Sequence, residues 1–250
     1  MIPISVTILT KNSEKYLKEV LSALQDFDEV LLYDNGSTDQ TFAIAGEFPN
    51  VRIVVGTFEG FGVTHNKASK AAKHDFILSI DSDEVVTLEM VHAIQNLELN
   101  PNAVYSFPRH NFFEGKWIRS CGWYPDRQYR LYHRKITAFT LAEVHEAIIV
   151  EGHQHISVDA PLIHYSYANQ NDFLAKMQSY SSLFAKQYAG KKKASVPIAL
   201  AHSVGAFLKS YFIKKGFLGG AQGFMISMYN ANTAFYKYLK LREANLQLRP

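Results

Sequence analysis

An apolar run of strand length, residues 76–80, leads directly into four residues that carry three carboxylates, Asp81-Ser82-Asp83-Glu84. Carboxylates this close together repel one another and are costly to desolvate unless a positive charge neutralises them. A divalent cation that also holds phosphate oxygens is the usual solution, because Mg²⁺ and Mn²⁺ favour one or two carboxylates together with phosphate. The cluster therefore predicts an enzyme that handles a phosphorylated or nucleotide-bearing substrate through a metal.

The first hundred residues alternate between strand patterns and helix patterns. Strands are predicted at Ile4–Thr10, Glu29–Tyr33, Val51–Val55 and Asp75–Ile80. Helices are predicted near residues 17–24 and at Gln40–Glu47, His65–Ala72 and Thr87–Leu97. This alternation favours a parallel, doubly wound α/β sheet.

The turn Asp34-Asn35-Gly36-Ser37-Thr38-Asp39 closes the second predicted strand, as the acidic cluster closes the fourth. Taken alone, this turn is also explained as a polar turn with a helix cap. In doubly wound sheets, however, ligands bind beyond the carboxyl ends of the strands. We therefore expect Asp34 and the residues 81–83 to share one crevice.

After Pro101 the pattern changes to short strands in a loop-rich region, at Val104–Phe107, Gln128–Tyr132 and Ala147–Val150. From Asn171 onward the chain is predicted to be helical, over Asn171–Tyr188, Pro197–Lys214 and Gln222–Lys240. The sequence thus predicts a catalytic domain at 1–168 and a helical region at 169–250 that faces acceptor or membrane.

Three segments together resemble the family 2 glycosyltransferases of the GT-A fold: residues 5–12, 34–41 and 78–84. The resemblance implies a Rossmann-like, mainly parallel sheet flanked by helices, a UDP-sugar donor and a bound Mn²⁺ or Mg²⁺. It also implies a role for each matching residue. Thr10 and Asn12 would lie beside the nucleotide, Asp34 would contact the uracil, Asp81 the ribose or the metal-bound phosphates, and Asp83 would be the principal metal ligand.

Further segments, 126–134, 144–146, 164–167 and 216–224, are similar to a subgroup that contains bacterial lipopolysaccharide inner-core glucosyltransferases. Those enzymes add glucose from UDP-glucose to a core heptose. The resemblance implies an inverting transfer of a hexose to a lipid-linked glycan acceptor.

Two kinds of catalytic side chain are expected for this reaction. An arginine would stabilise the departing diphosphate. Arg127 and Arg130 lie three apart on a predicted strand and point to different faces, so we expect only one of them to reach the phosphates, and Arg130 is preferred. Both arginines remain open to a reading as surface charges. An inverting transfer also needs a base for the acceptor hydroxyl, and Glu146 is our choice, with Glu143 and Asp126 as alternatives.

His164 follows the apolar residues 161–163, where a structural histidine is the ordinary interpretation. In the resembling fold a late histidine often completes the metal shell, so His164 is also a candidate ligand. His145 would orient substrate or simply pack. Trp117 and Trp123 would stack on a sugar face in the acceptor cleft or pack in the core.

The charge of the chain is divided unevenly. Residues 173–242 contain no Asp or Glu but ten Lys and one Arg, whereas residues 1–172 contain 14 basic and 22 acidic residues. One helical stripe in the basic region is apolar: Ala201, Val204, Leu208, Tyr211 and Phe212. The pattern fits a helix with a solvated basic face, or an interfacial helix on an anionic membrane surface, which we favour. No recognition module for nucleic acid is visible.

The remaining features predict a cytoplasmic protein that is peripheral on the inner face of the cytoplasmic membrane. The N-terminus lacks a basic leader, no run of about 18 uninterrupted apolar residues predicts a transmembrane helix, and Cys121 is the single cysteine.

Two other functions compete with a transferase. Residues 81–85 also satisfy the Asp-x-Asp-x-Val signature of haloacid-dehalogenase-like phosphatases, but that motif belongs on a first strand and needs a downstream acidic pair, which is missing here. A non-catalytic sugar-binding or membrane-binding protein with a degenerate site is the other alternative.

Overall fold

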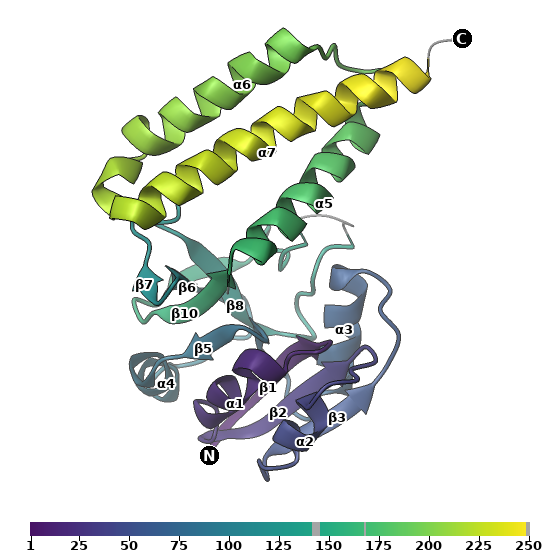
Figure 1. Ribbon diagram of the computed structural model, residues 1–250. Helices are drawn as coiled ribbons and strands as arrows, with labels where there is room; N and C mark the ends of the chain where they lie inside the picture. Colours follow the sequence, from purple (N-terminus) through teal and green to yellow (C-terminus); the bar gives the residue numbers. More distant parts are fainter. Residues whose placement is uncertain (142–145, 168, 249–250) are drawn as a thin grey trace. The chain divides into compact units, whose positions relative to one another are not determined.

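The computed structural model describes residues 1–141, 146–167 and 169–248. The chain divides into two compact units (Figure 1). Unit 1 comprises Met1–His110 and Asp126–His164, and unit 2 comprises Asn111–Pro125 and Tyr165–Pro250. The short segment 111–125 therefore belongs with the C-terminal helices, and not with the strands that flank it in sequence.

Unit 1 is built on a parallel sheet with the strand order β3-β2-β1-β4. The four strands are β1 (Ile2–Thr10), β2 (Phe27–Asp34), β3 (Val51–Val55) and β4 (Phe76–Asp81). In the register of this sheet Thr10 lies opposite Asp34, and Leu9 lies opposite Asp81. The carboxyl ends of β1, β2 and β4 are therefore level, which brings the predicted acidic residues to one edge.

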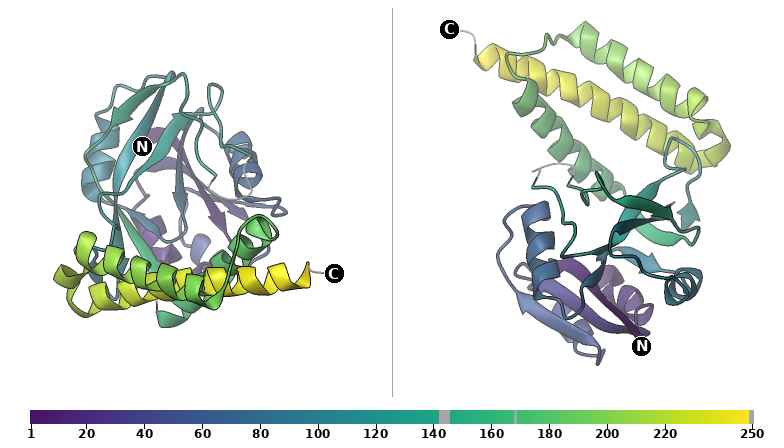
Figure 2. Two further views of the ribbon diagram at one scale, coloured as in Figure 1. Left: turned by 90° about the horizontal axis from the view of Figure 1, so that it is seen from above. Right: turned by 180° about the vertical axis from the view of Figure 1, so that it is seen from behind.

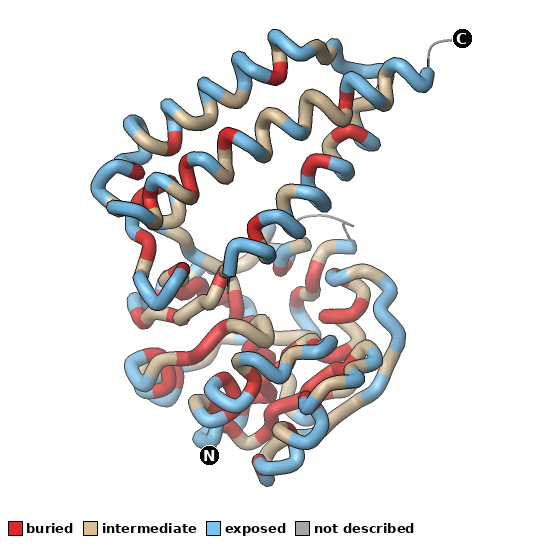
Figure 3. Tube along the Cα trace, in the orientation of Figure 1, coloured by how far each residue is buried: buried red, intermediate tan, exposed pale blue. Residues whose placement is uncertain are grey.

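Helices cover both faces of this sheet (Figures 1 and 2). Right-handed crossovers place α1 (Glu14–Ser22) and α2 (Thr41–Ala45) on one face and α3 (Phe61–Ala71) on the other, because the chain reverses its direction across the sheet after β3. The central strand β1 is consequently buried on both faces (Figure 3). Ile4, Val6 and Ile8 are fully covered on one face, and Ser5 and Thr7 are fully covered on the other. The predicted doubly wound arrangement is confirmed.

Antiparallel strands extend the sheet beyond β4, in the order β8-β6-β10-β5. They are β8 (Arg127–His133), β6 (Ala103–Phe113), β10 (Leu162–Tyr167) and β5 (Glu84–Val86); β9 (Gln154–Ser157) pairs with β6, and α4 (Leu88–Gln95) follows β5. The predicted strand Ala147–Val150 is wrong, because Ile148 makes only an isolated bridge to Phe139. Strands β5 and β9 were not expected, because runs of three and four residues carry little periodicity. Strand β10 was not expected either.

Unit 2 consists of long helices and a small hairpin. Strand β7 (Lys116–Trp117) pairs with the end of β6, and the helices are α5 (Gln170–Tyr188), α6 (Val196–Leu208), the π-helical turn η1 (Lys209–Ile213), the 3₁₀ turn η2 (Gly216–Gly219) and α7 (Gly220–Gln247). A capping box of Asn169 and Asp172 begins α5. Both α5 and α6 lie along α7 (Figures 1 and 2). Gly223 permits the close approach of η2 to α7, because a Cβ there would lie 1.9 Å from the carbonyl oxygen of Gly216.

One described helical segment, Val196–Ile213, is long and apolar enough to cross a membrane by length and composition alone. This segment was not predicted to be a transmembrane helix from the sequence, because His202 and Lys209 interrupt its apolar run.

Candidate functional site

The carboxylate of Asp34 organises the edge of the sheet at the end of β2. One oxygen accepts hydrogen bonds from the backbone N–H groups of Gly36 and Ser37, and the other accepts from the hydroxyls of Ser37 and Thr10. Burial raises the pKa of Asp34, but these four hydrogen bonds outweigh it, so the pKa lies below its ordinary value. Asp34 is therefore ionised and shapes the turn that follows it.

The loop after β1 is joined to the same turn. The side-chain oxygen of Asn12 accepts from the N–H of Thr38 at 2.8 Å, and the N–H of Asn12 donates to the hydroxyl of Ser37 at 2.8 Å. Asn12 has a φ of +53°, which asparagine tolerates better than most residues. The Ser13 hydroxyl then donates to Ser82 at 3.1 Å, which connects this loop to the acidic cluster.

Arg130 on β8 lies between two carboxylates of the cluster. Its guanidinium donates to Asp81 at 2.7 Å and to Glu84, whose side chain is fully buried. Glu84 in turn accepts from the N–H of Asp81 at 3.0 Å and pairs with Arg109 at 3.3 Å. The repulsion that the sequence predicted within the cluster is thus relieved by two arginines from neighbouring strands.

The pKa values of this network follow from burial and from the arginine. Burial raises the pKa of Asp81, but Arg130, with His65 and His164, reverses this and holds it well below its usual range. Burial also raises the pKa of Glu84, against the opposing charge of Arg130. Burial would lower the pKa of Arg130, but Asp81 and Glu84 raise it. Among the described residues, Nε of Arg130 is one of the buried side-chain atoms without a hydrogen-bond partner.

His65 on α3 is also buried in this region. The sequence predicted only that it lies in a helix and gave it no role in the site. Its ring stacks on Phe139 with 4.3 Å between the ring centres, and its Nδ1 lies 3.2 Å from the hydroxyl of Ser79. Burial lowers the pKa of His65 to about 4, against the opposing charge of Asp81. The imidazole is therefore neutral at pH 7.

We expect this histidine to make stability depend on pH. The unfolded chain binds a proton on His65 below its ordinary pKa of 6.5, whereas the folded chain does so only below about 4. The titration of His65 therefore leaves the free energy of unfolding unchanged above pH 6.5 and lowers it by roughly 3 kcal/mol as the pH falls to 4. The variant His65→Gln should lack this contribution to the pH dependence of the free energy of unfolding, as measured by urea unfolding from pH 7 to pH 4. His92→Gln, at an exposed position, serves as the control; an unchanged slope in His65→Gln would contradict the prediction.

The two predicted metal ligands lie together. Asp83, in the turn after β4, and His164, on β10, approach within 3.6 Å between carboxylate oxygen and Nε2. Among the residues that the structure describes, no group of three or more His, Cys, Asp or Glu could hold a metal through protein ligands alone. A carboxylate and an imidazole fit a Mn²⁺ or Mg²⁺ ion whose other positions are filled by phosphate oxygens and water.

The candidate bases differ in how far their carboxylates are already engaged. Asp126 is held by Arg109 at 2.8 Å and by Gln128 at 2.7 Å. Glu143 lies outside the described residues, as does His145. Glu146 is half-buried, and its neighbour Ala147 pairs with Thr140, whose carbonyl packs against Gly62 in the first turn of α3. Because α3 begins beyond the carboxyl end of β3, Glu146 lies at the same end of unit 1 as Asp34.

The two arginines of β8 point to different faces, as their spacing predicts. Arg127 pairs with Asp159 at 2.8 Å and donates to backbone carbonyls of Ser106 and Val158, away from the acidic cluster. In unit 2, Trp123 stacks on Tyr167 at 5.6 Å between ring centres and packs against the buried Phe173. A core role therefore accounts for Trp123, while Trp117 contacts the guanidinium of Arg119.

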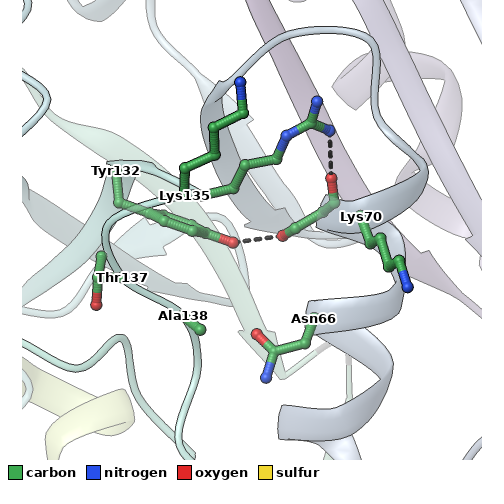
Figure 4. Close-up of a pocket in the computed structure, with 8 residues that line it drawn as sticks. Asn66, Lys70, Tyr132, Lys135, Thr137 and Ala138 are labelled. Atoms are coloured by element: carbon green, nitrogen blue, oxygen red, sulfur yellow. Dashed lines mark hydrogen bonds between the residues drawn. The ribbon is translucent and has the colours of Figure 1, made fainter.

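A cavity of about 540 Å³ in unit 1 lies elsewhere (Figure 4). Its walls come from α3 and from the chain after β8, and Tyr132 closes one side through a hydrogen bond to Ser69. Arg134 and Lys135, which also line it, are both paired with Asp75. The residues at the start of β4 pair with this end of β8, so the cavity is at the opposite end of the strand from Asp81, and none of the predicted site residues lines it.

Three residues of the network were not predicted to act in the site: Glu84, Arg109 and His65. Glu84 was visible as the fourth residue of the acidic cluster, and its position on β5 explains its burial. Arg109 and His65 carry no local signal, because their partners are 25 and 14 positions distant in sequence.

Unit 1 is thus an α/β unit of the doubly wound class, and its ionised carboxylates gather at the carboxyl ends of the parallel strands, where such sheets bind their ligands. The sequence comparisons narrow this class. Residues 5–149, more than half of the chain, match the model of glycosyl transferase family 2. The chain belongs to this family, and it is a glycosyltransferase.

Relatives extend the match over the whole chain. An uncharacterized glycosyltransferase of Rickettsia bellii is 28% identical over 266 residues, which cover 99% of this chain and 88% of that protein. The lipopolysaccharide core biosynthesis glycosyltransferase LpsC of Rhizobium meliloti is 24% identical over 262 residues, covering 100% and 96%. Among solved structures, a mannosyltransferase of Pyrobaculum calidifontis superposes with a TM-score of 0.53 at 14% identity, covering 99% and 88%. The predicted GT-A fold is confirmed.

Proposed function

We propose that the protein is an inverting hexosyltransferase that moves glucose from UDP-glucose to a lipid-linked glycan, the heptose of a lipopolysaccharide core. The observation that carries the proposal is the approach of Asp83 to His164 beside the ion pair of Asp81 and Arg130. The full-length relationship to LpsC supports the acceptor class. Family membership also favours transfer over the phosphatase alternative.

Asp83 and His164 would hold the Mn²⁺ or Mg²⁺ ion. The Pyrobaculum mannosyltransferase, which shares the fold, is solved with GDP-Man and Mn²⁺. When bound, the ion supplies positive charge to the diphosphate that leaves the sugar. The guanidinium of Arg130, which pairs with Asp81, would add positive charge beside the same group.

The loops after β1 and β2 would hold the nucleotide. Thr10 and Asn12 fix the turn that begins at Asp34, and Asp34 would accept a hydrogen bond from the uracil. Four donors already occupy its oxygens, so we infer that the hydroxyl of Ser37 turns away when the base binds. Asp81, kept ionised by Arg130, would contact the ribose or the phosphates.

Glu146 would accept the proton of the acceptor hydroxyl as that oxygen attacks the anomeric carbon and UDP departs. Its rival Asp126 is held by Arg109 and Gln128, which supports this choice. A base that is paired with an arginine is a weak proton acceptor, because the ion pair lowers its pKa.

We expect Glu146→Gln to keep UDP-glucose binding and to lose transfer to heptose-terminated lipopolysaccharide by about 100- to 10,000-fold in kcat, the range for a general base. Titration calorimetry gives the first quantity and a radiolabelled-glucose assay the second. Glu151→Gln, at an exposed position, is the matched control. Normal transfer by Glu146→Gln would move the base role to Glu143 or Asp126.

The donor is identified by UDP release from a panel of nucleotide sugars, without acceptor, in Mn²⁺ and in EDTA. Slow metal-dependent release from UDP-glucose alone would support the donor assignment, and faster release from another sugar nucleotide would replace it. UDP binding without release from any donor, in the presence of core lipopolysaccharide, would instead favour a non-catalytic sugar-binding protein.

The two sequence regions would have separate roles. Residues 1–168 would bind the nucleotide, and residues 169–250 would face the acceptor or the membrane. A lipid-linked acceptor would place the enzyme on the inner face of the cytoplasmic membrane as a peripheral protein.

A further inference from the structure

Helix α6 and the turn η1 carry an exposed apolar stripe. Every fourth side chain contributes to it, and each is between 45% and 57% exposed: Val196, Leu200, Val204, Leu208 and Phe212. Residues four apart lie on one face of a helix. The stripe continues into the following turn through Ile213, Phe217 and Leu218, which are also exposed. We name these eight residues the α6 stripe.

The neighbouring face of α6 is the one that packs on α7. Ala199 and Ser210 are buried there, and the Ser210 hydroxyl accepts hydrogen bonds from Ser227 and Asn230 of α7. His202 stacks on Tyr238 at 4.0 Å between ring centres. Figure 3 shows that most of α6 is exposed or half-buried. Packing on α7 thus fixes the helix while the α6 stripe stays in contact with solvent.

The structure refines the stripe predicted from sequence. Tyr211 is half-buried and packs against Phe207 at 5.2 Å and Phe224 at 6.1 Å, so it belongs to the packed side. From Val196 to Leu208 the helix has no Asp, Glu, Lys or Arg. A face this apolar is unusual on a protein surface unless something covers it.

The charges around the α6 stripe indicate what covers it. Exposed lysines stand at both ends: Lys191, Lys192 and Lys193 before α6, and Lys209, Lys214 and Lys215 after it. No acidic residue occurs between positions 173 and 242. An apolar face with lysines at its ends and no acids is the pattern of a helix in the headgroup region of an anionic bilayer.

We propose that α6 and η1 lie flat in the interface of an anionic membrane, with the α6 stripe among the acyl chains and the lysines at the headgroups. This deepens the peripheral location proposed above by naming the surface that makes contact. Lysine side chains can place their methylene groups against the apolar layer and keep the ammonium group in the headgroups.

A helix that crosses the membrane is the first competing arrangement. Eighteen residues span about 27 Å, close to the thickness of the hydrocarbon core. However, α7 runs along α6 and carries Asn230, Lys237 and Lys240 in the same stretch, and these groups would lose their water in a bilayer. The flat arrangement keeps α7 outside the hydrocarbon.

A second copy of the chain is the other possible occupant of the stripe. Two copies joined across a twofold axis would bring the same patch together. Each patch here carries lysines and no acid, so the copies would repel one another. Anionic lipid provides the complementary charge that a second copy lacks.

The test is sedimentation of the full-length protein with phosphatidylcholine vesicles and with vesicles that also contain phosphatidylglycerol, without donor or acceptor. We expect binding that requires phosphatidylglycerol, weakens with salt and is released by alkaline carbonate. Leu200→Gln/Val204→Gln should bind at least tenfold more weakly, and Lys191→Gln/Lys193→Gln/Lys209→Gln should lose the preference for anionic lipid. The control Leu88→Gln/Ile136→Gln changes exposed apolar residues of unit 1 and should bind as wild type.

Three outcomes would overturn the proposal. These are equal vesicle binding by Leu200→Gln/Val204→Gln and wild type, resistance to carbonate extraction, and dimerisation without vesicle binding that the same variant abolishes. Donor hydrolysis in these variants should stay at the wild-type rate. Vesicle binding by the wild type with no UDP release from any donor, even in the presence of core lipopolysaccharide, would reject the proposed transferase reaction and leave the membrane surface intact.

Discussion

The variant Asp83→Ala should lose donor turnover by about 1000-fold or more. Asp83 and His164 are the two side chains that would hold the metal at the sugar diphosphate. Asp81 is a poor substitute, because its carboxylate is already committed to Arg130. UDP release from the donor identified in the panel measures the loss.

A binding measurement separates a lost metal from a lost fold. Wild type should bind UDP more tightly with Mn²⁺ than with EDTA, whereas Asp83→Ala should bind with one affinity in both, as measured by titration calorimetry. Asp26→Ala, at an exposed position beside the amino end of β2, is the matched control and should keep both activity and the response to Mn²⁺. Full activity of Asp83→Ala would remove this residue from the site.

His164→Ala provides an independent check on the pair. If both side chains hold one ion, the loss in Asp83→Ala/His164→Ala should be smaller than the two separate losses combined, because the second substitution removes a ligand from a site that is already empty. Additive losses would mean that the two residues act separately.

The second large effect concerns stability. Arg130→Met should lower the free energy of unfolding by about 3–5 kcal/mol, the usual cost of removing one partner from a buried ion pair. Glu84 would then remain fully buried with Arg109 as its remaining cation, at 3.3 Å. Urea unfolding followed by circular dichroism gives the difference.

A double variant tests whether the loss comes from the stranded carboxylate. Arg130→Met/Glu84→Gln removes the charge that Arg130 neutralised, so it should recover part of the stability that Arg130→Met loses. Arg130→Lys should fall between wild type and Arg130→Met, because lysine keeps the charge but not the planar guanidinium, whose Nη2 donates to both carboxylates. Asp159→Asn, which breaks the exposed pair with Arg127, should cost less than about 1 kcal/mol.

If Arg130→Met proves as stable as wild type, the ion pairs of Arg130 contribute nothing to folding, and its burial would need another explanation. If the double variant is no more stable than Arg130→Met, the loss comes from the missing side-chain volume and not from Glu84.

The sequence by itself determined the class of fold and the edge of the sheet that carries the chemistry. Alternating strand and helix periods predict a parallel sheet, and in such a sheet every carboxyl end meets the same edge. The positions of Asp34 and Asp81 at strand ends are therefore readable without coordinates, and the register of β1 with β2 and β4 confirms them. These features are local, so a pattern in one segment is enough to reveal each of them.

The tertiary structure alone decided which charges meet. Arg130 is 49 positions from Asp81, and His164 lies on β10, a strand that was not predicted from the sequence. The order of β4, β8, β6 and β10 in the sheet brings these residues together, and that order depends on pairing between distant strands. The same is true of His65, whose low pKa results from burial by residues far along the chain.

In the helical unit, neither the neighbours of each helix nor its exposed face could be predicted from the sequence. It showed the excess of lysine and the apolar character of residues 196–213, because composition is a local property. It misplaced Tyr211 on the outer stripe, and it gave no sign that 111–125 belongs with these helices. Which side of an apolar helix is covered depends on the surface of its neighbour, here α7, and only the folded chain supplies that surface.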